Sequence, residues 1–106
     1  MKLPAEIQNK IERLHLLYEK YKVKRAFLFG SAVNGDFNPE RSDIDMLVDM
    51  DDLPPVERGE YLMKLWSELE DLFARKIDLL TQNSIRNPYL KSSIENSKYL
   101  IYDRKR

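Results

Sequence analysis

The sequence predicts one small α/β domain. Its 106 residues, of which 42% are hydrophobic and 34% charged, leave room for a single core. Short apolar runs such as residues 26–29 and 76–80 suit buried strands. Longer stretches at residues 4–21 and 56–73 carry apolar side chains every three or four positions, which is typical of amphipathic helices. Because a chain of this length has no room for a second core, we expect residues 1–106 to fold as one domain.

The charge balance and the missing cysteines exclude several classes of function. Eighteen basic and eighteen acidic residues cancel, so no basic surface favours direct binding to nucleic acid or to anionic lipid. The absence of cysteine excludes disulfides, thiolate metal sites and a cysteine nucleophile. Apolar runs fall short of the ~18 residues of a membrane helix, and the start lacks the apolar segment of a signal peptide. We therefore expect a cytoplasmic protein without a membrane partner.

The segment Phe27–Val48 holds the first candidate site. An apolar strand ends at Gly30-Ser31, a helix of about one turn follows and is closed by Gly35, and a polar loop leads to a second strand. Glycine lets a bulky anion approach the backbone, the first N–H groups of the helix point toward such an anion, and the Ser31 hydroxyl can donate one more hydrogen bond. Gly30 and Ser31 are therefore candidates for holding a phosphate.

The second candidate site consists of three aspartates. Asp43 and Asp45 stand two residues apart on a predicted strand and so share a face, with Cα atoms ~6.6 Å apart. Asp78 lies on a third predicted strand, and if the two strands are neighbours three carboxylates meet. At a separation of ~5 Å each pair repels by roughly 3 kcal/mol at an effective dielectric of ~20, so the cluster needs protons or cations. An all-oxygen set without histidine or thiolate fits Mg²⁺.

The last third of the chain predicts a helix and a short strand. Asn83 or Ser84 can cap the helix, whose regular part we expect to begin near Pro88. The expected buried side consists of Leu90, Ile94 and Ser97.

Each motif alone is ordinary, since Asp-x-Asp is usually polar strand surface and Gly-Ser is usually a turn. Their order along the chain favours catalysis. In that order the chain resembles the DNA polymerase β-like nucleotidyltransferase superfamily, and within it the minimal nucleotidyltransferase (MNT) proteins. The resemblance depends on residues 30–35, 42–48 and 77–79 and covers essentially the whole chain.

The resemblance implies a fold, a reaction and a partner. The fold is the nucleotidyltransferase fold, a small mixed β-sheet flanked by helices. Asp43, Asp45 and Asp78 would bind two Mg²⁺ ions, Asp78 would also help activate the acceptor, and Gly30 and Ser31 would hold ATP by its triphosphate. The acceptor hydroxyl would attack the α-phosphorus and pyrophosphate would leave. Similar proteins are antitoxins of HEPN–MNT toxin–antitoxin pairs, in which AMP is transferred to a tyrosine of the HEPN toxin.

Two departures from the family pattern keep other interpretations open. Asn34 stands where many relatives have arginine, and the loop from Asp36 to Ser42 is about one residue longer than usual. One alternative is an inactive antitoxin that neutralises its partner by contact alone. Exposed tyrosines would form the contact surface of such a protein, with Tyr89, Tyr99 and Tyr102 as candidates.

The other alternative is transfer to a small molecule such as an aminoglycoside, with dimerisation supplying the missing substrate domain. The apolar residues 99–102 also suggest a surface that a homo-oligomer or hetero-oligomer would cover.

Overall fold

The computed structural model describes residues 3–35, 37–38, 40 and 43–105. Within these residues the loop that precedes the second strand is described only in part, so the predicted length difference at residues 36–42 lies outside the described residues. The elements, in chain order, are α1 (Ala5–Gln8), α2 (Ile11–Lys20), β1 (Val23–Phe29), α3 (Ser31–Asn34), β2 (Ile44–Met50), α4 (Pro55–Phe73), β3 (Ile77–Thr81), the short 3-10 helix η1 (Gln82–Ser84), α5 (Pro88–Ser97) and β4 (Tyr99–Asp103).

The described strands form one mixed sheet with the order β3-β2-β1-β4. β1 runs antiparallel to β2 and to β4, whereas β2 and β3 are parallel. The parallel pair is possible because α4 connects the two strands across one face of the sheet. The mixed sheet flanked by helices confirms the predicted fold class. It also makes β2, which carries Asp45 and begins directly after Asp43, a central strand.

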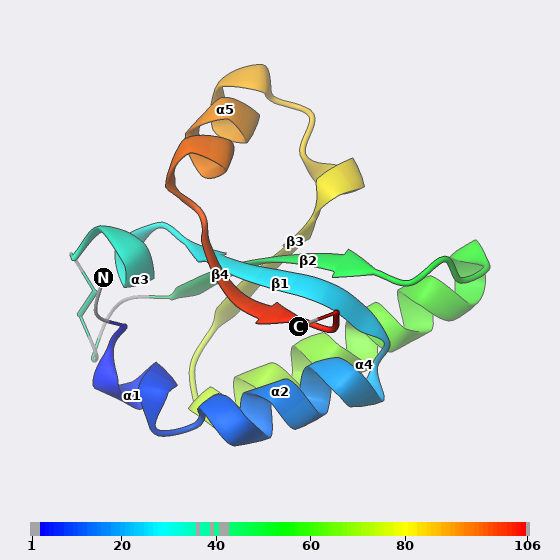
Figure 1. Cartoon of the computed structure of the whole chain (residues 1–106), viewed down its shortest axis with the longest axis horizontal. Coiled ribbons are helices and arrows are strands. Elements are labelled where there is room, and N and C mark those ends of the chain that lie inside the picture. The colour runs from blue at the N-terminus through cyan, green and yellow to red at the C-terminus, as the bar shows by residue number, and fades with distance from the viewer. Residues whose placement is uncertain (1–2, 36, 39, 41–42, 106) are drawn as a thin grey trace.

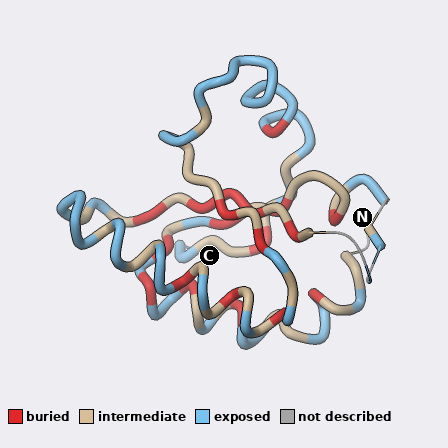
Figure 2. Tube along the Cα trace, turned by 180° about the vertical axis from the view of Figure 1, so that it is seen from behind, coloured by how far each residue is buried: buried red, intermediate tan, exposed pale blue. Residues whose placement is uncertain are grey.

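Two helices cover one face of the sheet. α2 and α4 lie together beneath it, and α5 stands above the opposite face (Figure 1). Buried positions follow the strands and the inner sides of α2 and α4, while the α5 lobe is mostly exposed (Figure 2). The fully buried side chains of the core with the largest volumes are Tyr18, Phe73, Ile7, Leu14, Leu28, Ile44, Met46, Leu65, Leu69, Ile77 and Val23.

The predicted first helix is divided into α1 and α2 by a turn at Asn9 and Lys10. After this turn the Lys10 ammonium donates a hydrogen bond of 2.8 Å to the carbonyl oxygen of Leu72, in the last turn of α4. A cation is favourable at that end of a helix, where carbonyl groups lack partners. The break therefore joins the N-terminal helices to α4.

The predicted cap and buried side of the last helix were partly wrong. Asn87 caps α5, since its side-chain oxygen accepts hydrogen bonds from the N–H groups of Tyr89 and Leu90. Ile94 is buried as expected, but Leu90 is 45% exposed and Ser97 is exposed as well. Of the three residues predicted to be buried, Ile94 alone packs α5 against the body of the protein.

The predicted C-terminal strand is confirmed as β4. It pairs with β1, and the His15 side chain of α2 forms a hydrogen bond of 2.7 Å with the carbonyl oxygen of Ile101. Tyr102 packs against the rings of His15 and Tyr18, with centroid distances of 5.3 Å in both pairs. β4 is thus held by residues of the same chain.

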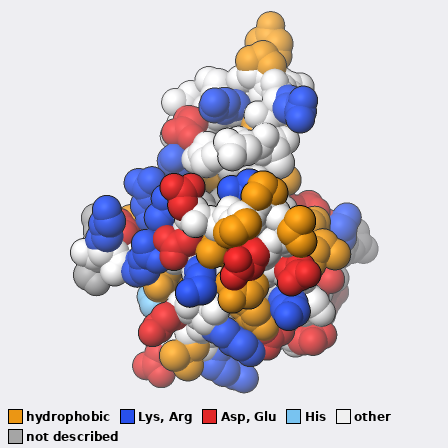
Figure 3. All heavy atoms as spheres, turned by 90° about the vertical axis from the view of Figure 1, so that its right-hand side faces the viewer, with side chains coloured by type: hydrophobic (Ala, Val, Ile, Leu, Met, Phe, Trp, Pro, Cys, Tyr) orange, Lys and Arg blue, Asp and Glu red, His pale blue; other side chains and the backbone are white. Residues whose placement is uncertain are grey.

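No helix in the described part of the chain is long and apolar enough to cross a membrane. On the face drawn in Figure 3, basic and acidic side chains lie side by side, as the equal charge totals predict.

Candidate active site

Gly30 forms the turn between β1 and α3, and its backbone requires glycine. Its φ of +70° and ψ of −144° belong to a region that side chains with a Cβ rarely adopt. A Cβ built at this position would lie 2.3 Å from Oδ2 of Asp45, so the carboxylate packs directly over the glycine. α3 then begins with hydrogen bonds from the N–H groups of Val33 and Asn34 to the Gly30 carbonyl oxygen, at 3.0 and 3.1 Å.

The sheet register brings Asp45 and Asp78 together. Asp45 lies opposite Phe29 on β1 and beside Asp78 on β3. Residues in register on neighbouring parallel strands point to the same face, so both carboxylates leave the sheet on the α5 side, opposite the core. The sequence-based expectation that these two aspartates meet agrees with this register.

Two side chains of α4 fix the start of β3. The indole N–H of Trp66 donates a hydrogen bond of 2.7 Å to the carbonyl oxygen of Ile77, and the carboxylate of Glu70 accepts one of 3.2 Å from the Ile77 N–H. Ile77 immediately precedes Asp78. The position of that aspartate therefore depends on α4, which lies on the other face of the sheet.

Asp43 joins the acidic group from the residue before β2. The ammonium of Lys76 lies 3.9 Å from Asp43 Oδ2 and 3.9 Å from Asp78 Oδ1. One exposed cation thus lies between two of the three carboxylates. Sequence reasoning assigned no role to Lys76, although the strand predicted at residues 76–80 puts it on the same face as Asp78. In the structure Lys76 directly precedes β3.

The pKa of Asp45 is raised from 3.8 to about 6. Partial burial is the main cause, since it disfavours the charged form. A hydrogen bond with Asp78 and repulsion from the charges of Asp78 and Asp43 act in the same direction, while the Lys76 charge opposes them. The site therefore holds more negative charge than its surroundings stabilise.

The fit of a metal ion can be judged from these side chains. Across residues 3–35, 37–38, 40 and 43–105, no three Asp, Glu, His or Cys side chains are arranged as a metal site. The carboxylates nevertheless supply oxygen donors and unneutralised charge. Mg²⁺ retains several waters and takes further oxygens from substrate phosphates, so it does not need a complete protein cage. The donor set fits a magnesium ion that arrives with a phosphate ligand.

A cleft of about 370 Å³ opens between α3 and α5, and of the residues that the structure describes Asp45 is the one carboxylate in its lining. Of the predicted site residues, Gly30 and Asp45 line it together with Asn34, whereas Ser31, Asp43 and Asp78 do not. Its remaining lining residues, which the sequence did not single out as site residues, are Phe29, Val33, Leu90, Ser93, Ile94 and Ser97. The last four of these residues lie on one face of α5, and the sequence shows that spacing. Any amphipathic helix has the same spacing, so it does not by itself indicate a cleft.

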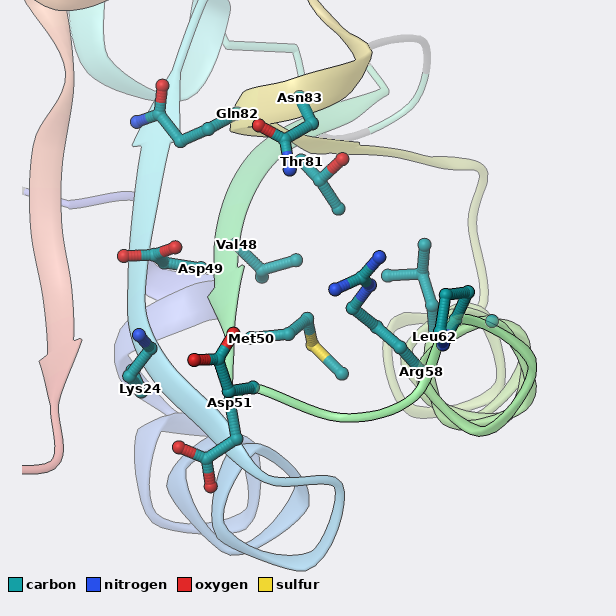
Figure 4. Close-up of a pocket in the computed structure, with 13 residues that line it drawn as sticks. Lys24, Val48, Asp49, Met50, Asp51, Arg58, Leu62, Thr81, Gln82 and Asn83 are labelled. Carbon is teal, nitrogen blue, oxygen red and sulfur yellow. The ribbon is translucent and has the colours of Figure 1, made fainter.

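A second hollow of about 320 Å³ lies near the other end of β2. It is bordered by Met50 and by Thr81 of β3, and Arg58 of α4 extends into it (Figure 4). None of the sequence-predicted site residues lines this hollow. Asp45 and Gly30, which both line the cleft beside α5, instead mark that cleft as the candidate active site.

The fold, the glycine turn and the paired carboxylates define a nucleotidyltransferase. The chain belongs to the Nucleotidyltransferase domain family, whose model matches residues 11–101. It is 45% identical over 104 residues to a Methanocaldococcus jannaschii protein with the provisional name protein adenylyltransferase MJ1379, a match that covers 96% of this chain and 99% of that protein. It is 30% identical over 84 residues to the protein adenylyltransferase MntA of Thermococcus cleftensis, covering 79% of this chain and 81% of MntA.

Solved structures agree with this assignment. A chain in the crystal structure of a toxin–antitoxin with AMP-PNP superposes with a TM-score of 0.60 and 27% identity, covering 92% of this chain and 74% of that one. The enzyme class of the present chain is therefore that of the nucleotidyltransferase family, and its fold is shared with this neighbour.

Proposed function

We propose that this protein transfers AMP from ATP to a tyrosine hydroxyl of a partner protein, a HEPN-type toxin, and thereby acts as the antitoxin. The observation that carries the proposal is the position of Asp45, which lines the cleft, packs against Gly30 and lies beside Asp78 on the neighbouring strand. The names of the relatives point to protein adenylylation, and the neighbour solved with AMP-PNP is a toxin–antitoxin.

The glycine turn and the acidic group would bind different parts of the substrate complex, the triphosphate and the metal. Gly30 and Ser31 would hold the triphosphate, because among the described residues no side chain caps the start of α3. Asp43, Asp45 and Asp78 would hold Mg²⁺, two ions being expected. Bound there, the metal would supply charge neutralisation for the phosphates and for the leaving pyrophosphate.

The chain's own residues would direct the transfer. The acceptor oxygen would form a bond to the α-phosphorus, the bond from that phosphorus to the oxygen bridging to the β-phosphorus would break, and pyrophosphate would leave. Asp78 would accept the phenolic proton from the acceptor. Its place on β3, which Trp66 and Glu70 fix at Ile77, would keep that carboxylate in a constant position beside Asp45.

The proposal is tested with the product of the adjacent gene as the candidate partner. The two purified proteins are incubated with ATP and Mg²⁺, and the intact mass of the partner is measured. We expect mass gains in steps of one AMP, located on tyrosine by fragmentation, and no gain with the combined variant Asp43→Ala and Asp45→Ala. A partner that stays unmodified, or a gain that survives in this variant, would overturn the proposal.

The same double variant separates catalysis from neutralisation by contact, when its binding to the partner and the remaining activity of the partner are measured. Asp43→Ala with Asp45→Ala removes charge at the site but leaves α5 and β4 intact. If this variant binds the partner and fails to neutralise it, transfer is required. If it neutralises as well as the wild type, the chain acts by binding alone.

A further inference from the structure

The cleft between α3 and α5 has two chemically different ends. Gly30 and Asp45 form a polar floor where backbone and carboxylate meet. The walls are largely apolar and include Phe29, Val33, Leu90 and Ile94. A nucleoside triphosphate has the same asymmetry, because its phosphates are anionic while its base presents flat apolar faces.

We propose that the α5 wall of this cleft is the subsite for the nucleoside part of the substrate, with Leu90 and Ile94 against the base. The inference rests on the proposed function, since it assumes that the triphosphate occupies the Gly30 and Asp45 end. The nucleotide would then lie with its phosphates at the polar floor and its base at the α5 wall.

The exposure of Leu90 supports this assignment. Leu90 is 45% exposed although it lies on the cleft side of α5, one turn before the buried Ile94. An apolar side chain left open beside an acidic floor gains burial when a flat apolar group enters the cleft. Within the described residues, the body of the protein buries Ile94 alone among the residues of α5 and leaves Leu90 partly open to the cleft.

Ser93 keeps the subsite open. Leu90, Ser93, Ile94 and Ser97 follow the spacing of one helix face, and all four line the cleft. The hydroxyl of Ser97 donates a hydrogen bond of 2.8 Å to the Ser93 carbonyl oxygen and is thus used within the helix. A larger side chain at Ser93 would fill the space between α5 and α3. Ser92, which is exposed and does not line the cleft, provides a matched position on the same helix.

The experiment compares ATP with inorganic tripolyphosphate, which has the phosphates but no nucleoside. Binding of each to the full-length protein is measured by calorimetry in the presence of Mg²⁺. We expect Ser93→Leu to weaken ATP binding by about tenfold or more, the usual effect of a one-group change in an apolar pocket, and to leave tripolyphosphate binding unchanged. Ser92→Leu should bind both as the wild type does.

A second variant guards against misfolding as the explanation. Leu90→Ala removes apolar wall without filling the cleft, and it too should weaken ATP but not tripolyphosphate. Unchanged ATP binding in both Ser93→Leu and Leu90→Ala, or equal losses for the two ligands, would overturn the subsite. If the binding pattern appears while no partner protein gains AMP, the subsite stands and the proposed protein transfer fails.

Discussion

Asp45 has two close neighbours of opposite character, the bare backbone of Gly30 and the carboxylate of Asp78. Its pKa of about 6 in the folded protein exceeds the ordinary value of 3.8, so the folded state holds the proton more tightly than the unfolded chain does. Stability from this group is therefore greatest below pH 4 and is lost as the pH rises through about 6. At neutral pH the ionised Asp45 opposes folding.

Replacement of this charge should stabilise the metal-free protein. Asp45→Asn cannot ionise, and above pH 6 we expect it to unfold with a free energy on the order of 1 kcal/mol higher than the wild type, after allowance for solvent screening of a half-exposed group. The difference should shrink between pH 6 and pH 4, because the wild-type carboxyl becomes protonated. Urea denaturation with EDTA at pH 5 and pH 7.5 measures it. An advantage that does not change with pH would contradict the assigned cause.

Gly30→Ala should strongly reduce nucleotidyl transfer and moderately reduce the stability of the fold. The added Cβ would force the Asp45 carboxylate to move, and the positive φ would cost about 1 kcal/mol. We expect nucleotidyl transfer to fall by about a hundredfold, the scale on which one misplaced charge-stabilising group acts. Transfer rates and thermal unfolding of Gly30→Ala measure the two effects.

Gly35→Ala is the matched control. Gly35 has a φ of +88°, but a Cβ there would meet nothing within 4 Å. Its alanine variant should lose similar stability and retain transfer. If both variants lose transfer equally, backbone strain rather than displacement of Asp45 is the cause.

At the scale of the elements, α4 ends in an unfavourable conformation. Ala74 follows the helix with φ +51° and ψ +42°, the left-handed region in which glycine is the usual residue. The turn is needed because β3, which starts at Ile77, must run back beside β2.

Ala74→Gly should therefore stabilise the protein. Removal of the Cβ relieves strain of about 1 kcal/mol, and part of this gain is offset by the greater freedom of glycine in the unfolded chain. We expect a net increase of roughly 0.5 kcal/mol in the free energy of unfolding, with an unchanged dependence on urea concentration. A decrease would show that the helix end is not strained.

The elements differ in how far the sequence predicts them. The strands, α3 with its glycine end, and α4 follow from apolar spacing and turn residues. The break between α1 and α2 does not, because it depends on the Lys10 contact with the distant Leu72 carbonyl. α5 was predicted as a helix, but its exposed Leu90 looks in the sequence like a core residue. Periodicity shows which side chains share a face and cannot show whether another element or a cleft lies opposite.

At the scale of the whole molecule, the acidic group is assembled from two separate segments of the chain. Asp43 and Asp45 are close in sequence, so local spacing predicts their pairing. Asp78 joins them because β2 and β3 are parallel neighbours, and strand order cannot be derived from spacing alone. The family resemblance supplied that expectation, and the register agrees with it. Lys76 and the α5 wall became apparent only from the folded chain.

Ligand binding should stabilise the whole domain, since the site joins β1, β2 and β3. ATP with Mg²⁺ at a hundred times its Kd should raise the free energy of unfolding by about 2.7 kcal/mol, whereas ATP with EDTA should raise it much less. Thermal unfolding with and without the chelator measures the difference. The combined variant Asp43→Ala and Asp45→Ala should show no magnesium-dependent increase, and an increase that persists there would place the metal elsewhere.

The contact between Gly30 and Asp45 also constrains how such proteins can change over generations. Because the carboxylate occupies the space that any Cβ at Gly30 would need, a lineage that replaces the glycine displaces the aspartate in the same step. The two codons are then released from selection together, so we expect inactive descendants to have lost both residues rather than either one. In a genome, the loss of this pair would distinguish antitoxins that only bind from those that still modify their partner.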